Sequence, residues 1–335
     1  MSRFLTSLYI LLALTLPQAN AQQTKTTSIP IHNAQALVLI GTPGYPIDGI
    51  YHLANDIDMR QLTTQQLQQG CLPIGGRSQA IFNGQLDGRG KTIRHLRIHK
   101  PQQDGVGLFY GVGQEACVEN VCLENVKVQG RNNVGIIAGY NYGCIKKIEL
   151  KAKSLLIIKG NKYVGSVVGT NKGRISEIRT AGNVRGHTMV GGLAGENHGN
   201  ISEIRIQSTV TGYKSTGGLV GKNKGKINKI EPQSTVTGYA MVGGLVGENS
   251  GRISKVRAQS TVTGYELIGG LVGKNKGKIT QCTIAGKVTG VLKVNSLAGE
   301  NHGTTTFYLS WRVKKFQLAP NSNKVLSLKP PQKAI

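Results

Sequence analysis

Cationic side chains recur at a fixed spacing in the second half of the chain, and such side chains could bind an anion. Lys226, Arg252 and Lys278 follow one another at intervals of 26 residues, with no acid interleaved in the series. Lys224 and Lys276 lie two residues before the first and the last of them. If one interval is one coil of a stacked β structure, neighbouring cations lie about 4.8 Å apart, well inside the Debye length of about 10 Å at 0.1 M salt. A bound polyanion would relieve their repulsion.

Carboxylates are not grouped in the way that hydrolysis of a glycan or binding of calcium would require. A glycosidase needs a pair of carboxylates, and a calcium site needs an acidic cluster. The Glu residues of the second half are isolated and balanced by Lys or Arg, and the segment 55–58, Asn-Asp-Ile-Asp, fits a turn better than a calcium site. The five Asp residues all precede the regular repeats: Asp48, Asp56, Asp58, Asp87 and Asp104.

Motifs for metals and phosphates are missing from the sequence as well. None of the seven His stands in an H-E-x-x-H pattern, and no Cys residues have the C-x-x-C spacing of a zinc site. The Gly- and Lys-rich segment that begins at Gly218 lacks the Gly-Lys-Ser/Thr ending of a phosphate loop. We therefore expect no catalysis, no metal and no cofactor.

Cysteine positions predict one disulfide. The count of five is odd, so not all of the Cys residues can pair within the chain. Cys117 and Cys144 occupy the same position in neighbouring repeats, which could place their Cα atoms within disulfide range, and we predict a Cys117–Cys144 bridge. Cys282 falls at a core position of its repeat and is predicted to be buried. The remaining two are Cys71 and Cys122.

An internal repeat is the element that must position these residues. A β-branched residue followed two positions later by Gly keeps the same period as a recurring Asn. A fixed period of this length indicates a solenoid, propeller or array. The Asn series is Asn141, Asn171, Asn197, Asn223, Asn249, Asn275 and Asn301, with one step of 30 residues followed by five of 26.

Each repeat contains three β-prone pieces, and this predicts an all-β parallel β-helix with about 26 residues per coil. The pieces are Gly-Gly-Leu-Val, Ile-x-x-Ile and Ser-Thr-Val-Thr, separated by Asn-x-Gly and Thr-Gly-Tyr corners. Three strands of five or six residues with three corners would use about 26 residues. Propeller blades, helical repeats and leucine-rich repeats have other lengths or residue patterns.

When coils stack, the residues at each position of the repeat form a column along the axis. We expect the Asn column to be scaffold, with amides bonded along the axis. The residue before each Asn alternates Glu and Lys from Glu196 to Glu300, which predicts a column that neutralises itself. Tyr213, Tyr239 and Tyr265, flanked by His187, predict an aromatic stack. A stabilising role is the favoured interpretation of that stack, and a platform for sugars is the alternative.

The chain divides into five predicted segments. Residues 1–21 read as a Sec signal peptide cleaved after Ala21, and no later segment is long and apolar enough to span a membrane, so we expect a secreted, periplasmic or cell-surface protein. Residues 22–104 form an N-terminal cap with the first β segments, 105–303 the β-helix repeats, 304–318 a C-terminal cap and 319–335 a disordered basic tail. The net charge of +25 favours anionic partners.

The repeat resembles a known family. Val190-Gly-Gly-Leu-Ala-Gly195 and Val242-Gly-Gly-Leu-Val-Gly247 are similar to the GLUG repeat of bacterial secreted and surface proteins, and residues 51–58, 72–75 and 82–93 resemble the segment that precedes such repeats. The resemblance covers about residues 47–303. It implies a right-handed parallel β-helix of the kind found in adhesins and in the non-catalytic part of immunoglobulin-A-cleaving metallopeptidases, whose zinc motif this sequence lacks.

Three functions fit these observations. The first is a secreted, non-catalytic, adhesin-like protein whose basic edge recognises an acidic glycan, lipopolysaccharide or nucleic acid, with Lys224, Lys226, Arg252, Lys276 and Lys278 as the contact residues. The second is a carbohydrate-active β-helix enzyme acting on acidic polysaccharide. The third is a purely structural surface protein. The sequence favours the first.

Overall fold

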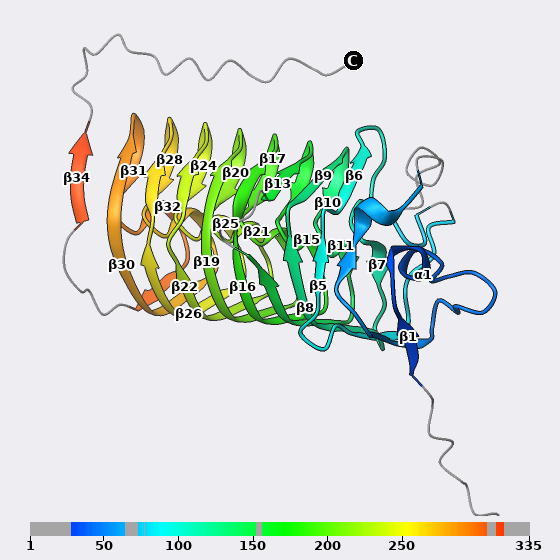
Figure 1. Cartoon of the computed structure of the whole chain (residues 1–335). Coiled ribbons are helices and arrows are strands. Elements are labelled where there is room, and N and C mark those ends of the chain that lie inside the picture. Colours follow the sequence, from blue (N-terminus) through cyan, green and yellow to red (C-terminus); the bar gives the residue numbers. More distant parts are fainter. Residues whose placement is uncertain (1–27, 64–72, 77, 152–155, 307–312, 318–335) are drawn as a thin grey trace, which may run out of the picture.

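Parallel β-strands stack from one coil to the next along the length of the molecule (Figure 1). The computed structural model describes residues 28–63, 73–76, 78–151, 156–306 and 313–317. It is a β-solenoid of about 10 coils that recur about every 26 residues, and the prediction of an all-β parallel β-helix is confirmed. The described helical segments are short: helix α1 (Ala34–Val38), at the N-terminal end of the stack, and the 3-10 turn η1 (Met59–Gln61).

Three parallel sheets form the walls. The long sheet contains 19 strands: β1 (Ile29–Ile31), β2 (Ile50–Leu53), β3 (Ile57–Asp58), β4 (Gln85–Asp87), β5 (Thr92–Arg94), β6 (Arg97–Lys100), β8 (Cys117–Glu124), β9 (Val126–Gly130), β12 (Cys144–Leu150), β13 (Leu156–Lys159), β16 (Arg174–Arg185), β19 (Asn200–Thr211), β22 (Lys226–Pro232), β23 (Thr235–Thr237), β26 (Arg252–Gln259), β27 (Thr261–Thr263), β30 (Lys278–Gly290), β33 (Thr304–Thr306) and β34 (Val313–Gln317).

The two other sheets are made of short strands. The seven-stranded sheet consists of β10 (Asn132–Val134), β14 (Lys162–Val164), β17 (Thr188–Gly191), β20 (Lys214–Gly217), β24 (Ala240–Gly243), β28 (Glu266–Gly269) and β31 (Leu292–Asn295). The eight-stranded sheet consists of β7 (Phe109–Val112), β11 (Ala138–Asn141), β15 (Val168–Asn171), β18 (Ala194–Asn197), β21 (Val220–Asn223), β25 (Val246–Asn249), β29 (Val272–Asn275) and β32 (Ala298–Asn301).

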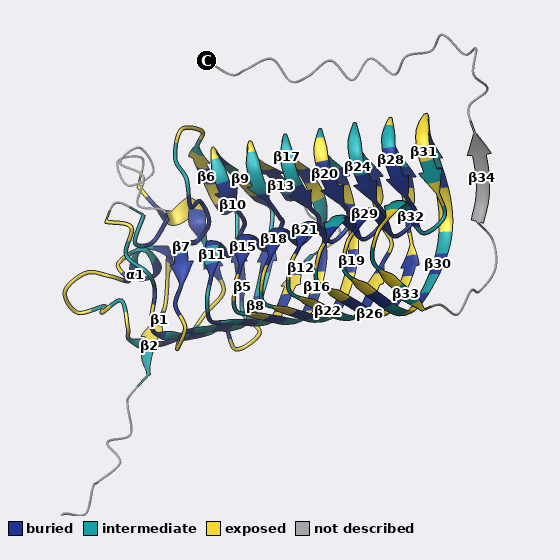
Figure 2. Cartoon of the chain, turned by 180° about the vertical axis from the view of Figure 1, so that it is seen from behind, coloured by how far each residue is buried: buried dark blue, intermediate teal, exposed yellow. Residues whose placement is uncertain are grey.

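Alternation of apolar and polar residues decides which side of each strand faces the core. In β19 the side chains of Ile201, Ile204, Ile206, Ser208 and Val210 are buried, while the intervening positions are exposed or half-buried. The register pairs Val210 with its equivalents one repeat away, so the β-branched column continues through successive coils. Burial of these columns in every coil makes one continuous apolar core (Figure 2). Cys282 belongs to it, as predicted, and burial raises the pKa of its thiol to about 11.

The three predicted β-prone pieces are distributed differently from expectation. The Ile-x-x-Ile and Ser-Thr-Val-Thr pieces lie on the same long sheet, and β19 runs through both without interruption. The Gly-Gly-Leu-Val piece instead contains a corner, because β17 ends at Gly191 and β18 begins at Ala194 on another sheet. A Cβ atom on Gly192 would lie 2.1 Å from the Gly218 carbonyl oxygen of the next coil. The Gly pair therefore permits the close approach of two backbones.

Residues other than glycine make a second kind of bend. Glu177, Glu203, Lys229 and Lys255 all have φ between 53° and 58°, in the left-handed region that disfavours side chains. These residues are left out of the strand pairing: Ser176 pairs with Ser202 and Ile178 pairs with Ile204, but Glu177 and Glu203 are not paired. The hydrogen-bonded neighbours on both sides hold this conformation in place. Nothing in these residue types signals such a bend in the sequence.

The Asn column is a hydrogen-bonded ladder inside the solenoid. Asn197 Nδ2 donates to Asn223 Oδ1 at 2.8 Å, and Asn223 Nδ2 donates to Asn249 Oδ1 at 2.8 Å. Each Nδ2 also reaches the carbonyl oxygen of the Gly two residues later, as in the 3.3 Å bond from Asn223 to Gly225. The column begins at Asn141, whose Oδ1 is buried without a partner, because Val112 occupies the equivalent position one coil earlier. The predicted scaffold role is confirmed in its geometry.

Several predicted features lie outside the described residues. These are the signal peptide at 1–21, the tail at 319–335, Cys71 and part of the C-terminal cap. From the cap, β33 and β34 both pair with β30. Within the N-terminal segment, β1, β2 and β4 already pair in parallel with one another and with β8. No helix among the described residues has the length and apolarity needed to cross a membrane.

Breaking the Asn ladder should destabilise the solenoid. Asn223→Ala removes an acceptor from Asn197 and a donor from Asn249, both of which are fully buried. Each buried polar group that loses its partner costs about 1–3 kcal/mol. Chemical denaturation followed by circular dichroism should show a lower midpoint for Asn223→Ala. The exposed Asn200→Ala is the control and should change stability by less than about 0.5 kcal/mol. Equal effects of the two substitutions would contradict the ladder's role.

Candidate anion-binding site

The cations predicted to form a basic edge lie on the first part of the long-sheet strands. Lys226, Arg252 and Lys278 are the first residues of β22, β26 and β30, and all three are exposed. Their positions pair directly from coil to coil, with Lys226 opposite Arg252 and Arg252 opposite Lys278. None of the three has an ion pair with another described residue. The structure therefore brings these three predicted residues together as adjacent cations.

The neighbouring column neutralises itself, as predicted. Lys222 Nζ lies 3.1 Å from a Glu248 carboxylate oxygen, and Lys274 Nζ lies 2.8 Å from a Glu300 oxygen. Glu196 is partnered by Lys224 at 3.0 Å instead of by Lys222. Burial raises the pKa of Glu196, but hydrogen bonds from Lys224 and His198 outweigh it, so that the pKa is lowered overall.

Lys224 thus differs from the other predicted contact residues, because its ammonium group already neutralises a carboxylate. An anion that bound Lys224 would have to compete with Glu196. Lys276, two coils further along in the same column, is exposed and follows Asn275 directly. We therefore place the centre of the candidate site on the Lys226, Arg252 and Lys278 column and not on Lys224.

Two further cations, which the sequence did not predict as contact residues, lie beside that column on the same strand as Arg252. Lys255 and Arg257 are exposed on β26, the strand that begins at Arg252, and this strand carries no acid. Earlier coils have acids at the same positions, namely Glu177 and Glu203 in the column of Lys255. Column-by-column comparison of charges would have found this change from mixed to basic. The basic patch is defined here as Lys226, Arg252, Lys255, Arg257 and Lys278.

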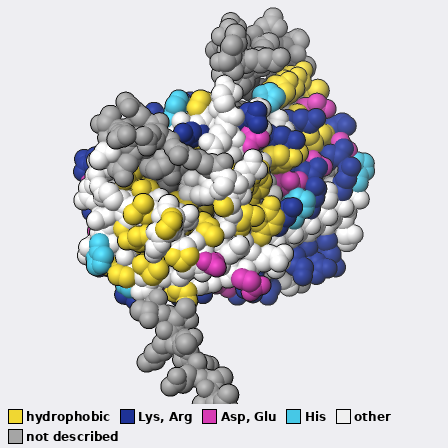
Figure 3. Space-filling view, turned by 90° about the vertical axis from the view of Figure 1, so that its right-hand side faces the viewer, with side chains coloured by type: hydrophobic (Ala, Val, Ile, Leu, Met, Phe, Trp, Pro, Cys, Tyr) yellow, Lys and Arg dark blue, Asp and Glu magenta, His cyan; other side chains and the backbone are white. Residues whose placement is uncertain are grey.

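Elsewhere on the molecule a number of cations are paired with acids. In a view onto the N-terminal end, Lys and Arg side chains alternate with Asp and Glu along one flank (Figure 3). Pairs such as Lys146–Glu119, at 3.0 Å, and Arg131–Asp104, at 2.7 Å, account for part of this balance. The basic patch differs from cation pairs such as Lys159–Arg185 because its central column continues through three consecutive coils without an acid.

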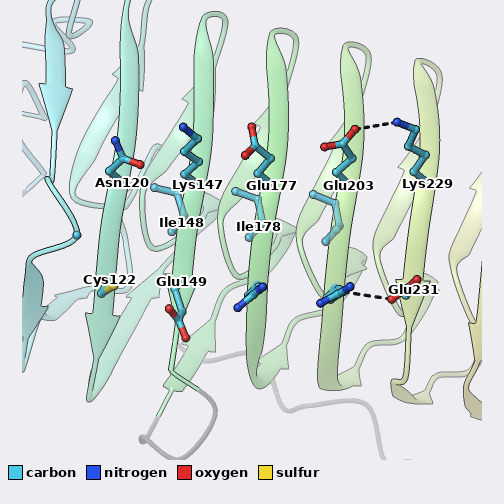
Figure 4. Close-up of a pocket in the computed structure, with 14 residues that line it drawn as sticks. Asn120, Cys122, Lys147, Ile148, Glu149, Glu177, Ile178, Glu203, Lys229 and Glu231 are labelled. Carbon is cyan, nitrogen blue, oxygen red and sulfur yellow. Dashed lines mark hydrogen bonds and ion pairs between the residues drawn. The ribbon is translucent and has the colours of Figure 1, made fainter.

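A groove of about 560 Å³ runs across the long sheet on the N-terminal side of the patch (Figure 4). Lys147, Glu177, Glu203 and Lys229 form one row along it, and Glu149 and Glu231 belong to a second row. Glu203 is paired with Lys229 at 3.0 Å, and Glu231 with Arg205 at 3.2 Å. Glu177 and Glu203 lie on neighbouring coils. The prediction that the Glu residues of the second half are isolated is therefore wrong for this pair, whose separation of 26 residues is one full repeat.

The segment proposed as an alternative calcium site uses its carboxylates for structural contacts. Asp56 accepts hydrogen bonds from the Thr92 backbone N–H at 2.9 Å and from Arg94 at 2.7 Å, and the Thr92 bond is the main cause of its lowered pKa. Asp58 accepts hydrogen bonds from Arg60, which lowers the pKa of its carboxyl group, and contacts His95. The turn interpretation is the one that these contacts support. No group of three or more potential ligands gathers for a metal in the part of the chain that the structure describes.

Cys117 and Cys144 lie directly opposite each other in β8 and β12. They are free thiols in this structure, and both are partly buried. Burial, together with a hydrogen bond to Cys144, raises the pKa of the Cys117 thiol to about 12. Opposed positions in adjacent parallel strands are close enough for a bridge, since disulfides span Cα separations of about 4.4–6.8 Å. The Cys117–Cys144 disulfide stays a prediction.

The predicted aromatic stack is present at the corner between the long and the seven-stranded sheets. Ring centroids are 5.0 Å apart for His187–Tyr213 and Tyr213–Tyr239, and 4.9 Å apart for Tyr239–Tyr265. The interplanar angles of 6° and 9° between the Tyr rings show that neighbouring rings cover each other's faces. A sugar that approached this column would therefore meet mainly ring edges and hydroxyl groups.

Comparison with known proteins supports the fold and leaves the function open. No family model matches the chain, so the GLUG resemblance stays an interpretation of the sequence. A putative immunoglobulin A1 protease from Bacteroides ovatus has a similar structure, with a TM-score of 0.54 and 20% sequence identity over 87% of this chain and 85% of that one. At this identity the likeness shows the β-helical fold alone. Halomucin from Haloquadratum walsbyi is 33% identical over 125 residues, which are 37% of this chain and 1% of that protein.

Mapping of free and bonded thiols tests the predicted Cys117–Cys144 disulfide. Alkylation of the unfolded, non-reduced protein should label Cys282 but neither Cys117 nor Cys144, and a digest should contain their linked peptides. After gentle reduction and refolding, alkylation near pH 8 should label Cys117 slowly, because few thiolates exist far below a pKa of about 12. Full labelling of both residues without reductant would disprove the bridge.

Proposed function

We propose that this protein is a secreted, non-catalytic, adhesin-like binding protein that recognises polyanions through the basic patch. The ligands in view are acidic glycans, lipopolysaccharide and nucleic acid, which share repeated negative charges. The observation that carries the proposal is the stacking of Lys226, Arg252 and Lys278 in consecutive coils, exposed and without ion pairs to the described residues.

Spacing supports a polymer as the ligand in preference to a single small anion. The patch presents a cation at each step of about 4.8 Å along the solenoid axis, with Lys255 and Arg257 beside the middle step. A chain with regularly spaced charges could contact several of these side chains at once. Each contact would release a counterion from the polymer, so binding must weaken as salt increases. The net charge of +25 would also accelerate the encounter with such a ligand.

Neutralising the column should weaken binding to heparin and to DNA. The triple variant Lys226→Gln, Arg252→Gln, Lys278→Gln removes three adjacent cations. At about 1 kcal/mol for each cation near an anionic surface, the loss is about 100-fold at low salt. The slope of log Kd against log salt concentration should also fall by about 3. Fluorescence anisotropy with labelled heparin fragments and with labelled DNA measures both quantities.

A second triple variant separates the patch from the general positive field. Lys127→Gln, Lys159→Gln, Arg185→Gln removes the same charge from exposed positions elsewhere on the long sheet. Lys159 and Arg185 are themselves adjacent in register, which makes this a demanding control. It should weaken binding by less than about threefold. Equal losses in the two triple variants, or binding that is insensitive to salt, would refute the assignment to the patch.

The groove is the observation that favours an alternative, a carbohydrate-active enzyme. Retaining and inverting glycosidases use two carboxylates, and Glu177 and Glu203 lie on neighbouring coils of the groove. Glu203, however, is neutralised by Lys229. We expect no release of reducing ends or unsaturated sugars when the protein is incubated with polygalacturonate, alginate or hyaluronan. Turnover that disappears in Glu177→Gln or Glu203→Gln would establish the enzyme and overturn the non-catalytic proposal.

A further inference from the structure

Three consecutive coils carry the same seven residues on the second half of the long sheet and at the corner that follows it. The sequence Gln-Ser-Thr-Val-Thr-Gly-Tyr occupies 207–213, 233–239 and 259–265. In each copy the Ser and Val side chains are buried in the core, whereas the Gln, both Thr and the Tyr side chains are exposed or half-buried. The outward side chains constitute what we call the neutral face: Gln207, Gln233, Gln259, Thr209, Thr235, Thr261, Thr211, Thr237, Thr263, Tyr213, Tyr239 and Tyr265.

The neutral face is an ordered lattice. The strand register places Thr209 opposite Thr235 and Thr235 opposite Thr261, and the second Thr column follows the same pairing. Gln207 Nε2 donates to Gln233 Oε1 at 2.8 Å, and Gln233 Nε2 donates to Gln259 Oε1 at 3.4 Å. The stacked Tyr rings form the border of the lattice. Polar groups therefore repeat at the interstrand spacing of about 4.8 Å along the axis.

Hydroxyl groups on this face are available to a ligand. No hydroxyl group of its Thr and Tyr residues forms a hydrogen bond with any residue that the structure describes. The second Thr column also continues into the next coil as Thr289, opposite Thr263. Each hydroxyl can both donate and accept, and the Gln amides add further donors and acceptors. A ligand with its own regular hydroxyl groups could pair with many of them at once.

Charge sets this face apart from the rest of a strongly basic chain. None of its members is charged, although the net charge of the protein is +25. Charged residues surround it: Arg185 precedes it and Lys287 follows it in the coils on either side, and the ion pair of Arg205 and Glu231 lies along one border. A polyanion would find no partner inside these borders. The complementary ligand is uncharged.

We propose that the neutral face binds an extended, neutral polysaccharide whose chain lies along the solenoid axis. In such a polymer one monosaccharide ring repeats over a length comparable to one interstrand spacing, so successive sugars meet equivalent Gln, Thr and Tyr side chains. A peptide that adds to a sheet needs a free strand edge, which this face does not offer. A protein interface would be expected to have an apolar core, whereas the centre of this face consists of hydroxyl and amide groups.

The test is affinity electrophoresis through gels that contain laminarin, glucomannan, hydroxyethylcellulose or dextran, confirmed by calorimetry in 1 M NaCl. At that ionic strength the Debye length is about 3 Å, so the basic patch contributes little. At least one of these polymers should retard the protein. The variant Thr209→Val, Thr235→Val, Thr261→Val keeps the β-branched shape but removes three hydroxyl groups, and its affinity should fall about tenfold or more.

Matched variants make the outcome decisive. Thr209→Ser, Thr235→Ser, Thr261→Ser retains the hydroxyl groups and should bind within about threefold of the natural protein. Absence of retardation by all four polymers would overturn the proposal, as would equal binding by the Val and natural proteins. A change in self-association of the Val variant during sedimentation, without a change in polysaccharide binding, would instead make the face an interface between copies. Binding of the Val variant to heparin should be unchanged, so failure here is separable from failure of the basic patch.

Discussion

The structure depends on one constraint, the close stacking of each coil on the next along three parallel sheets at once. Backbones approach so closely at the Gly-Gly corner that a Cβ on Gly218 would lie 2.1 Å from the Gly244 carbonyl oxygen. At the end of the eight-stranded sheet, the Asn ladder also bonds to backbone carbonyls of Gly residues with its Nδ2 groups. A coil with a different path through these positions would break both sets of contacts. A longer coil is accepted where the path is kept, since Asn141 lies 30 residues before Asn171 and still donates to it at 2.7 Å. The structural requirement is therefore that equivalent positions stay in register.

Stacking converts a period in the sequence into columns in space, and this is how the surface acquires distinct regions. Where Glu and Lys alternate, as at Lys222 and Glu248, the column neutralises itself with a 3.1 Å ion pair. Where cations repeat, as at Arg252 and Lys278, they stay adjacent and exposed. Where Thr repeats, a lattice of uncharged hydroxyl groups results. The basic patch and the neutral face thus occupy two halves of one sheet.

Much of the fold could be predicted from the sequence, because it depends on columns that the period makes visible. The apolar β-branched column, the Asn ladder, the Tyr stack and the burial of Cys282 all follow from placing equivalent residues on top of one another.

The route of each coil was less predictable from the sequence. The corner inside Gly-Gly-Leu-Val and the left-handed bend at Glu203 depend on contacts with adjacent coils, and neither Glu nor Lys favours that conformation. Lys255 and Arg257 lie in columns other than that of Arg252, and the change from mixed to basic charge in those columns is visible only when each is compared in turn. The Glu196 partner was missed because side chains reach diagonally, to Lys224.

Footprinting of lysines tests whether the strand register creates the proposed anion-binding site. The protein would be acetylated briefly with and without a heparin oligosaccharide, and the modification at each Lys quantified by mass spectrometry. Protection should be concentrated at Lys226, Lys255 and Lys278, which belong to three consecutive coils, while exposed Lys127 and Lys159 keep their reactivity. Uniform protection of all exposed lysines, or protection centred on Lys127 and Lys159, would show that the basic patch is not where heparin binds.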